Sequence, residues 1–187
     1  MFLRKIIPAL LLILQTGLLV AVPAEDDARD QKVYERYLSL LRRNPRQGTA
    51  LTRVLNWHRD RSTLDAFKKD LQAAVQDRPA DGASWMLLGL VAEEQSDVVS
   101  AAEAYRNAEK NRPEDHLAPW SLGRVLQKQR QNGAARDALE RALKLKPSRT
   151  DASAIYQSLA TLYGGASTAE ANAFWRQFEE AFPDDPR

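Results

Sequence analysis

Residues 82–113 read GASWMLLGLVAEEQSDVVSAAEAYRNAEKNRP, and this stretch decides the fold. Its small residues Gly89, Ala101 and Ala108 allow two antiparallel helices to approach closely, while the large apolar residues between them fill the remaining space. Pro113 ends the second helix, because proline lacks an amide donor and clashes with the preceding turn. The stretch therefore predicts a helical hairpin.

The hairpin pattern recurs with a period of 34 residues. The prolines that keep this spacing are Pro45, Pro79, Pro113 and Pro147. The same period relates further small and large positions, namely Leu88 and Leu122, Gly89 and Gly123, Ala101 and Ala135, Tyr105 and Leu139, and Ala108 and Ala142. A fixed period of this length is typical of repeat proteins, in which hairpins stack because none can bury its apolar face alone.

With Trp85 ahead of Gly89, and Pro113 closing the unit, this stretch resembles a tetratricopeptide repeat (TPR). The resemblance implies an all-α fold, an α-α superhelix in the form of a TPR-type solenoid of stacked antiparallel helix hairpins. By register, the array covers 48–187, with repeats at about 48–81, 82–115, 116–149 and 150–183. Residues 25–47 match the second half of a repeat and are expected to form an N-terminal half-repeat or capping helix.

Two repeats depart from the family pattern. Leu55 and Phe67 replace the small residues of the first repeat, so its helices are expected to lie slightly farther apart. Pro183 follows Pro147 by 36 residues, and we place the two extra residues in a loop at 164–166.

Local signals also predict where helices begin and turn. The expected N-terminal caps are Ser62 with Asp65, Asp81, Ser96 or Asp97, and Ser167 with Glu170. Asn132-Gly133 is expected to form the turn between the helices of the third repeat.

The first residues have the layout of a signal peptide. Arg4 and Lys5 precede an apolar run over 6–22, and Ala24 is followed at once by acidic residues. We expect residues 1–24 to be a cleaved signal peptide, which would place the protein outside the cytoplasm, as a periplasmic or secreted protein. The alternative is an uncleaved anchor, but a span needs about 20 apolar residues, and this run is shorter and interrupted. No stable membrane insertion is expected after cleavage.

The net charge of the chain bears on its possible partners, and its lack of cysteine bears on how the fold is stabilised. Removing residues 1–24 takes Arg4 and Lys5 from the 27 basic side chains and leaves 25 basic against 25 acidic ones. A net charge near zero gives no general attraction to nucleic acid, which is not expected as a partner. The chain has no cysteine, so its stability depends on helix packing rather than on disulfides.

No catalytic, cofactor-binding or metal-binding set is found in the sequence, and we expect the protein not to be an enzyme. Its two histidines, His58 and His116, lie in different repeats without a cluster of other ligands. They are interpreted as a helix-surface residue and a loop residue, respectively. An enzyme with dispersed catalytic residues is the least favoured hypothesis.

The TPR resemblance implies that the first helix of each repeat lines a concave groove that binds a protein or peptide partner. The groove candidates by register are Arg53, Asn56, Arg59, Met86, Leu87, Leu90, Glu93, Trp120, Arg124, Gln127 and Lys128, with Tyr156 and Tyr163 as uncertain additions. Trp120 and Arg124, four residues apart, are the preferred binding pair, because Trp and Arg are enriched at binding hot spots. The alternative is that Trp120 only fills the core.

The expected function is a protein–protein interaction or scaffolding module. A second hypothesis is self-association through the C-terminal helix, whose apolar stripe is Ala171, Trp175, Phe178 and Phe182, with Phe174 beside it. A third is that the chain is the N-terminal fragment of a longer array.

Overall fold

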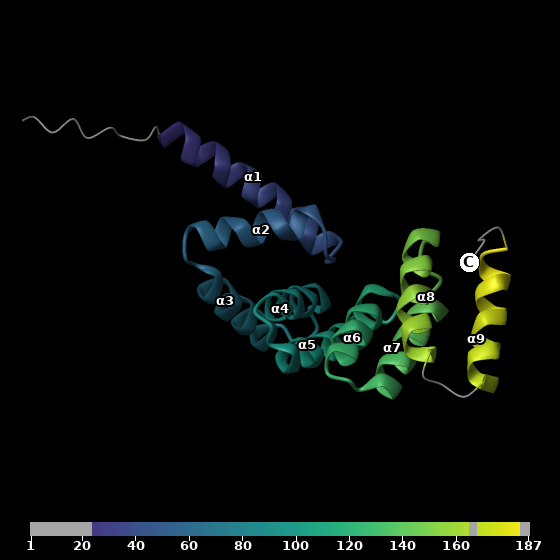
Figure 1. Ribbon diagram of the computed structural model, residues 1–187. Coiled ribbons are helices and arrows are strands. Elements are labelled where there is room, and N and C mark those ends of the chain that lie inside the picture. Colours follow the sequence, from purple (N-terminus) through teal and green to yellow (C-terminus); the bar gives the residue numbers. More distant parts are fainter. Residues whose placement is uncertain (1–23, 165–167, 184–187) are drawn as a thin grey trace, which may run out of the picture.

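The computed structural model describes residues 24–164 and 168–183 and is all-helical over these residues. The helices are α1 (Ala24–Arg43), α2 (Thr49–Asp60), α3 (Leu64–Asp77), α4 (Gly82–Glu94), α5 (Val98–Asn111), α6 (Leu117–Lys128), α7 (Asn132–Lys144), α8 (Arg149–Tyr163) and α9 (Thr168–Ala181). Figure 1 shows them as hairpins stacked side by side, with α1 at one end of the array and α9 at the other. The all-α superhelix of stacked hairpins is thus confirmed.

The turns inside the first three hairpins share one backbone feature. Ser62, Ser96 and Arg130 have positive φ values of 54°, 61° and 59°, and they lie 34 residues apart. The left-handed residue reverses the chain after α2, α4 and α6 in the same way. The prediction of a turn at Asn132-Gly133 is wrong by two residues, because both residues already belong to α7.

The helix caps agree with the sequence at two of the predicted positions. The Asp81 carboxylate accepts hydrogen bonds from the first amides of α4, and Asp97 accepts one from the amide of Ser100. The prediction of Ser62 as the cap of α3 is wrong, because Ser62 lies in the left-handed turn and Thr63 precedes the helix. Ser167 of the predicted final cap lies outside the described residues.

The two central hairpins, α4–α5 and α6–α7, are the most closely packed. A β-carbon on Gly89 would lie 2.5 Å from a ring carbon of Tyr105, and one on Gly123 would lie 2.6 Å from Leu139. Both large residues are fully buried. Glycine is therefore required at these positions for the helices to approach.

The α2–α3 hairpin is more open than the central ones, as Leu55 and Phe67 predict. The ring of His58 fills the gap, stacked on Phe67 at a centroid distance of 4.2 Å. The interpretation of His58 as a surface histidine is wrong, because only 9% of the residue is exposed and both ring nitrogens hydrogen-bond, to Tyr34 and Thr63.

Helix α1 and the segment after it close the N-terminal end of the array. α1 packs on α2 and also contacts α4. Leu41 near its end and Pro45 just beyond it are fully buried. We call residues 44–48, which connect α1 to α2, the strap.

The C-terminal hairpin is held by aromatic side chains. Figure 1 shows the ribbons of α8 and α9 standing apart, and the rings of Phe174, Phe178 and Phe182 fill the space between them by packing on Tyr156. These three phenylalanines are at most 6% exposed, whereas Trp175 is 42% exposed. The phenylalanines of the stripe on which the self-association hypothesis depends are therefore covered by the chain itself, and Trp175 is not.

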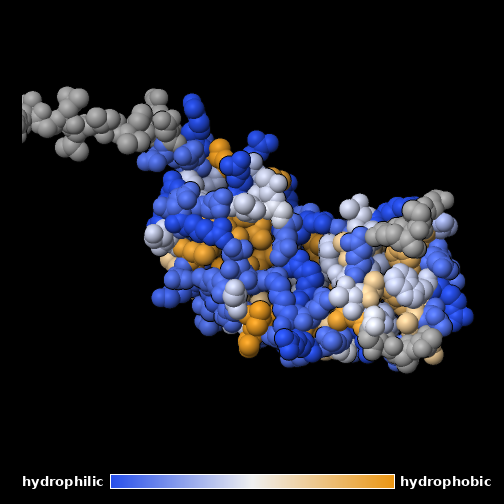
Figure 2. All heavy atoms as spheres, viewed as in Figure 1, coloured by the Kyte–Doolittle hydropathy of each residue, from blue (hydrophilic) through white to orange (hydrophobic). Residues whose placement is uncertain are grey.

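The face of the molecule in Figure 2 is mainly hydrophilic, with small hydrophobic patches. The exposed large hydrophobic residues of the described part are Val33, Leu40, Val99 and Trp175, which do not form one stripe. None of the described helices is both long and apolar enough to cross a bilayer. The predicted signal peptide lies outside the described residues, apart from Ala24 at the start of α1.

Candidate partner-binding surface

The first helices of the hairpins meet on one side of the array, which we call the inner surface. A pocket of about 430 Å³ lies here between α2, α4 and α6. Its lining includes Gln47 and Gly48 of the strap, Arg59 of α2, Glu93 of α4 and Lys128 of α6. The surface is thus polar and carries charges of both signs.

Glu93 is the centre of a charge network on this surface. Its side chain is only 5% exposed and accepts hydrogen bonds from Arg124 Nη2 at 2.8 Å and from Lys128 Nζ at 2.7 Å. The buried hydroxyl of Tyr105 donates to the same carboxylate at 3.0 Å. Three donors therefore compensate the cost of burying this carboxylate and join the second hairpin to the third.

The network shifts the protonation equilibria of both buried groups. Burial by itself would raise the pKa of Glu93, but Arg124 and Lys128 outweigh that effect, and the pKa is lowered. Burial raises the pKa of Tyr105 well above its usual value, and the neighbouring Glu93 carboxylate raises it further. Glu93 is therefore held ionised and Tyr105 neutral. These are the states in which the Tyr105 hydroxyl can donate a hydrogen bond to the Glu93 carboxylate.

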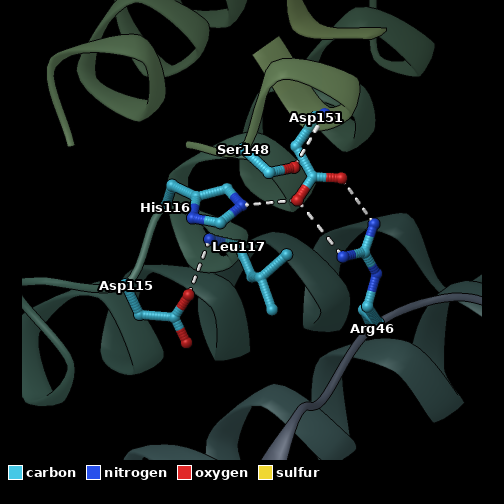
Figure 3. Close-up of polar contacts among 6 residues, drawn as sticks. All are labelled: Arg46, Asp115, His116, Leu117, Ser148 and Asp151. Atoms are coloured by element: carbon cyan, nitrogen blue, oxygen red, sulfur yellow. Dashed lines mark hydrogen bonds and ion pairs between the residues drawn. The ribbon is translucent and has the colours of Figure 1, made fainter. Parts of the chain in front are cut away.

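A second ionic cluster lies farther along the inner surface, where the strap reaches α8 (Figure 3). Arg46 donates to the two carboxylate oxygens of Asp151, with distances of 2.6 Å from Nη2 and 3.2 Å from Nη1. His116 Nε2 lies 3.1 Å from the same carboxylate and donates to it. The amide of Asp151 donates to Ser148 Oγ, which caps α8. The strap is thus tied to a residue 105 positions later in the chain.

Asp151 is nearly enclosed, with 6% of its side chain exposed. Burial would raise the pKa of this carboxyl, but the hydrogen bonds from Arg46 and His116 reverse the effect, and the pKa is lowered. The guanidinium of Arg46 also lies 5.9 Å from the centroid of the Trp120 ring, within the range of a cation–π contact. Trp120 is partly buried, and its indole N–H is enclosed without a hydrogen-bond acceptor among the described residues.

Three of the groove residues predicted from register are not available to a partner. Met86, Leu87 and Leu90 are at most 2% exposed and offer almost no surface to a partner, although Leu90 borders the pocket between α2, α4 and α6. These side chains belong to the same core as Leu41 of α1, which contacts α4.

Apart from Trp120, which lies beside Arg46, the remaining predicted residues divide into two places. Arg53 and Asn56 are exposed but border a pocket of about 180 Å³ between α1 and α2, away from the third hairpin. Arg124 and Lys128 lie on the inner surface with Glu93, and Gln127 is partly exposed beside them.

Tyr156 and Tyr163, the two uncertain additions to the groove, face α9 instead. Tyr163 stacks on Phe174 at 4.7 Å and donates to Glu140 at 2.6 Å. Burial, helped by that glutamate, raises the pKa of Tyr163 to about 12. Both tyrosines border a pocket of about 540 Å³ between α7, α8 and α9.

Two residues that matter on this surface, Arg46 and Asp151, were missed by sequence reasoning. Each lies beside a helix end, and neither has a periodic partner that the repeat pattern would mark. Their contact depends on how the array curves, which no local signal gives. His116 precedes α6, in line with its prediction as a loop residue, but the sequence does not predict its contact with Asp151.

Within residues 24–164 and 168–183, no group of three or more His, Asp or Glu side chains is arranged to hold a metal ion. The acidic and basic groups of the inner surface are instead paired with each other. The surface therefore presents ion pairs and hydrogen-bonding groups rather than a ligand set for a metal.

Comparison with known proteins agrees with this architecture. The tetratricopeptide repeat family matches residues 68–116, which cover most of α3 and the whole of α4 and α5. No curated protein sequence matches the chain.

Solved structures share the fold over most of their length. A crystal structure of MamA aligns with a TM-score of 0.58 at 18% identity, covering 85% of this chain and 90% of that one. TTC0263, described as a thermophilic TPR protein of Thermus thermophilus, aligns with a TM-score of 0.50 at 18% identity, covering 86% of this chain and 87% of that one. At this identity the likeness establishes the fold alone.

Proposed function

We propose that this chain is a non-catalytic interaction module, which holds another polypeptide on the inner surface of its TPR-type superhelix. The observation that carries the proposal is the polar pocket between α2, α4 and α6, beside which Lys128 is 54% exposed. The apolar residues beneath are already packed, so the surface offers charges and hydrogen-bonding groups to a partner. Because one fold hosts many functions, the support for this function is the chemistry of the surface and not the fold.

The test is an affinity capture from the native cell fraction, with Lys128→Ala as the binding variant. Lys110→Ala is the matched control, since Lys110 is an exposed lysine on α5, in the outer layer of the array. We expect the wild type and the Lys110→Ala variant to recover the same partner, and the Lys128→Ala variant to recover several-fold less. Equal recovery by both variants, with equal helicity by circular dichroism, would refute binding at this surface.

We also propose that the protein is exported and acts in a periplasm-like compartment or outside the cell. The support is the basic, apolar and acidic order of residues 1–27, with Ala24 before Glu25. N-terminal sequencing of the protein from the exported fraction should begin at Glu25. A product that retains Met1 and sediments with membranes would favour an anchored form instead.

The self-association alternative keeps one supporting observation, the exposed ring of Trp175. One exposed aromatic side chain is a small surface for a stable assembly. Sedimentation across a wide concentration range tests it directly, and a constant monomer mass would exclude it.

A further inference from the structure

The strap carries an arginine into a site that other parts of the chain build. Arg46 forms two hydrogen bonds with the Asp151 carboxylate, and its guanidinium lies over the Trp120 ring. The planar fork of a guanidinium matches a carboxylate and also stacks on an aromatic face, so this pair of groups favours arginine over lysine. A site that places a carboxylate beside an indole therefore selects arginine over lysine more strongly than a single surface ion pair does.

The two partners of this ion pair differ in burial. The Asp151 side chain is 6% exposed, whereas the Arg46 side chain is 38% exposed. Asp151 is fixed in place by His116 and by its own amide, which donates to Ser148. The carboxylate thus belongs to the framework, and the guanidinium approaches it from the solvent side, as a ligand would.

The strap is anchored by Pro45 rather than by Arg46. Pro45 is fully buried, while the amides of Arg46 and Gln47 donate to no other backbone group within the described part of the chain. Gly48 has φ 141°, and no atom lies within 4 Å of the place where its β-carbon would be. The Arg46 side chain can therefore leave Asp151 while Pro45 stays packed.

We infer that Asp151, His116 and Trp120 form an arginine-recognition site, which Arg46 fills in the unbound protein and an arginine of an extended partner segment fills in the complex. The inference rests on the proposed function, because the site lies on the same inner surface. Exchange of one guanidinium for another keeps the enclosed carboxylate compensated. A neutral or acidic partner residue would leave Asp151 without its cation, and lysine lacks the planar fork that fits both the carboxylate and the indole, so the partner residue is an arginine.

The test uses the full chain and a blocked hexapeptide of sequence Asn-Pro-Arg-Gln-Gly-Thr, which copies residues 44–49 and holds one arginine. Binding is followed by NMR titration of the indole N–H signals, with Trp120 assigned from a Trp120→Phe variant. Arg46→Ala opens the site, and Arg46→Gln serves as a second open form, since glutamine carries no charge to pair with Asp151. The peptide is raised to about 10 mM, because the tethered arginine competes at an effective concentration on the order of mM.

We expect saturable shifts of the Trp120 signal in the Arg46→Ala chain and at least about tenfold weaker binding to the wild type, where the site is filled. An Arg46→Ala/Asp151→Asn chain should lose the response, and a peptide with alanine in place of arginine should give none. The inference is overturned if both open forms, folded by circular dichroism, ignore the peptide. Equal binding by the alanine peptide, or by the Asp151→Asn chain, would also overturn it.

The capture experiment separates this inference from the proposed function. If the native partner binds and depends on Lys128 but not on Asp151, the interaction module stands and the arginine site fails. If the peptide binds through Asp151 but no native partner depends on Lys128, the arginine site stands and the proposed function fails. A partner recovered several-fold better by Arg46→Ala than by wild type, lost with Asp151→Asn and reduced with Lys128→Ala, supports both.

Discussion

The ring of Tyr105 occupies the space that a side chain at Gly89 would need, with a ring carbon 2.5 Å from the position of the missing β-carbon. Tyr105 is fully buried, and its hydroxyl is held by Glu93. The ring therefore has no room to retreat. This contact sets how closely α4 and α5 approach in the hairpin that best matches the repeat pattern.

Replacing Gly89 with alanine should consequently destabilise the protein. We expect a loss of about 1–3 kcal/mol, the usual cost of overpacking a well-packed core. The matched control is Gly133→Ala, in the first turn of α7, where nothing lies within 4 Å of the added carbon. That change should be neutral or stabilising by about 0.4–1 kcal/mol. Urea unfolding followed by circular dichroism measures both, and equal effects would contradict the close contact.

The Glu93 network predicts an acid-dependent loss of stability. The pKa of Glu93 is lower in the folded protein than its ordinary value of 4.5, so its contribution is present above that value and is lost as pH falls through the folded pKa. Glu93→Gln should cost about 1–3 kcal/mol at neutral pH, because Arg124 and Tyr105 lose a charged acceptor. The free energy of unfolding of the variant should then fall less steeply than that of the wild type below about pH 5.

Lys128→Ala is the control for this prediction. Lys128 is mostly exposed, so its replacement should lower the free energy of unfolding by less than about 1 kcal/mol. The variant retains Glu93, Arg124 and Tyr105, so part of the acid dependence should remain. If Glu93→Gln and the wild type had parallel profiles below about pH 5, the carboxylate would not be the group responsible.

The fold could be predicted from the sequence because the repeat period appears in residues close in sequence. Gly89, Tyr105 and Pro113 lie within one hairpin, and each has a local structural reason for its identity. The left-handed turns at Ser62 and Ser96 follow the same period, although their residue types do not reveal it. Local rules were therefore sufficient for the hairpins.

The inner surface was less predictable, because register tells which face a residue lies on but not what covers it. Leu90 borders the inner pocket, as the register implies, yet only 2% of it is exposed and it belongs to the core. Arg46 and Asp151 meet only because the hairpins that lie between them are stacked with a particular curvature. Contacts of this kind depend on the summed geometry of the array, and no periodic signal marks them.

The C-terminal helix gives a prediction that separates core packing from self-association. Phe174 is 4% exposed and stacks on Tyr163, so Phe174→Ala should lower the free energy of unfolding by about 3–5 kcal/mol. Its neighbour Trp175 is 42% exposed, and Trp175→Ala should cost much less, about 1 kcal/mol. Thermal unfolding together with sedimentation tests both changes. A change in mass on loss of Phe174, without a change in stability, would restore the self-association hypothesis.

His58 predicts a second pH dependence, in a different range. Burial lowers the pKa of His58 below 6.5, an effect that Asp70 opposes and Arg61 reinforces. The unfolded chain therefore binds a proton near pH 6.5 that the folded chain does not yet bind, and stability should fall as pH drops from about 7.5 toward the folded pKa. The hydroxyls of Tyr34 and Thr63 could accept from a charged ring, so burial against Phe67, rather than a missing acceptor, opposes protonation.

In a His58→Gln variant this part of the pH dependence should disappear. The variant should also be less stable at about pH 7.5, because glutamine cannot stack on Phe67 as the imidazole does, and a cost of about 1–2 kcal/mol is expected. His116→Gln is the control, since it leaves the α2–α3 hairpin intact and should keep the slope that His58 contributes. Urea unfolding at several values between about pH 7.5 and 5.5 gives the free energies. A slope that survives in His58→Gln would show that a group other than His58 takes up the proton.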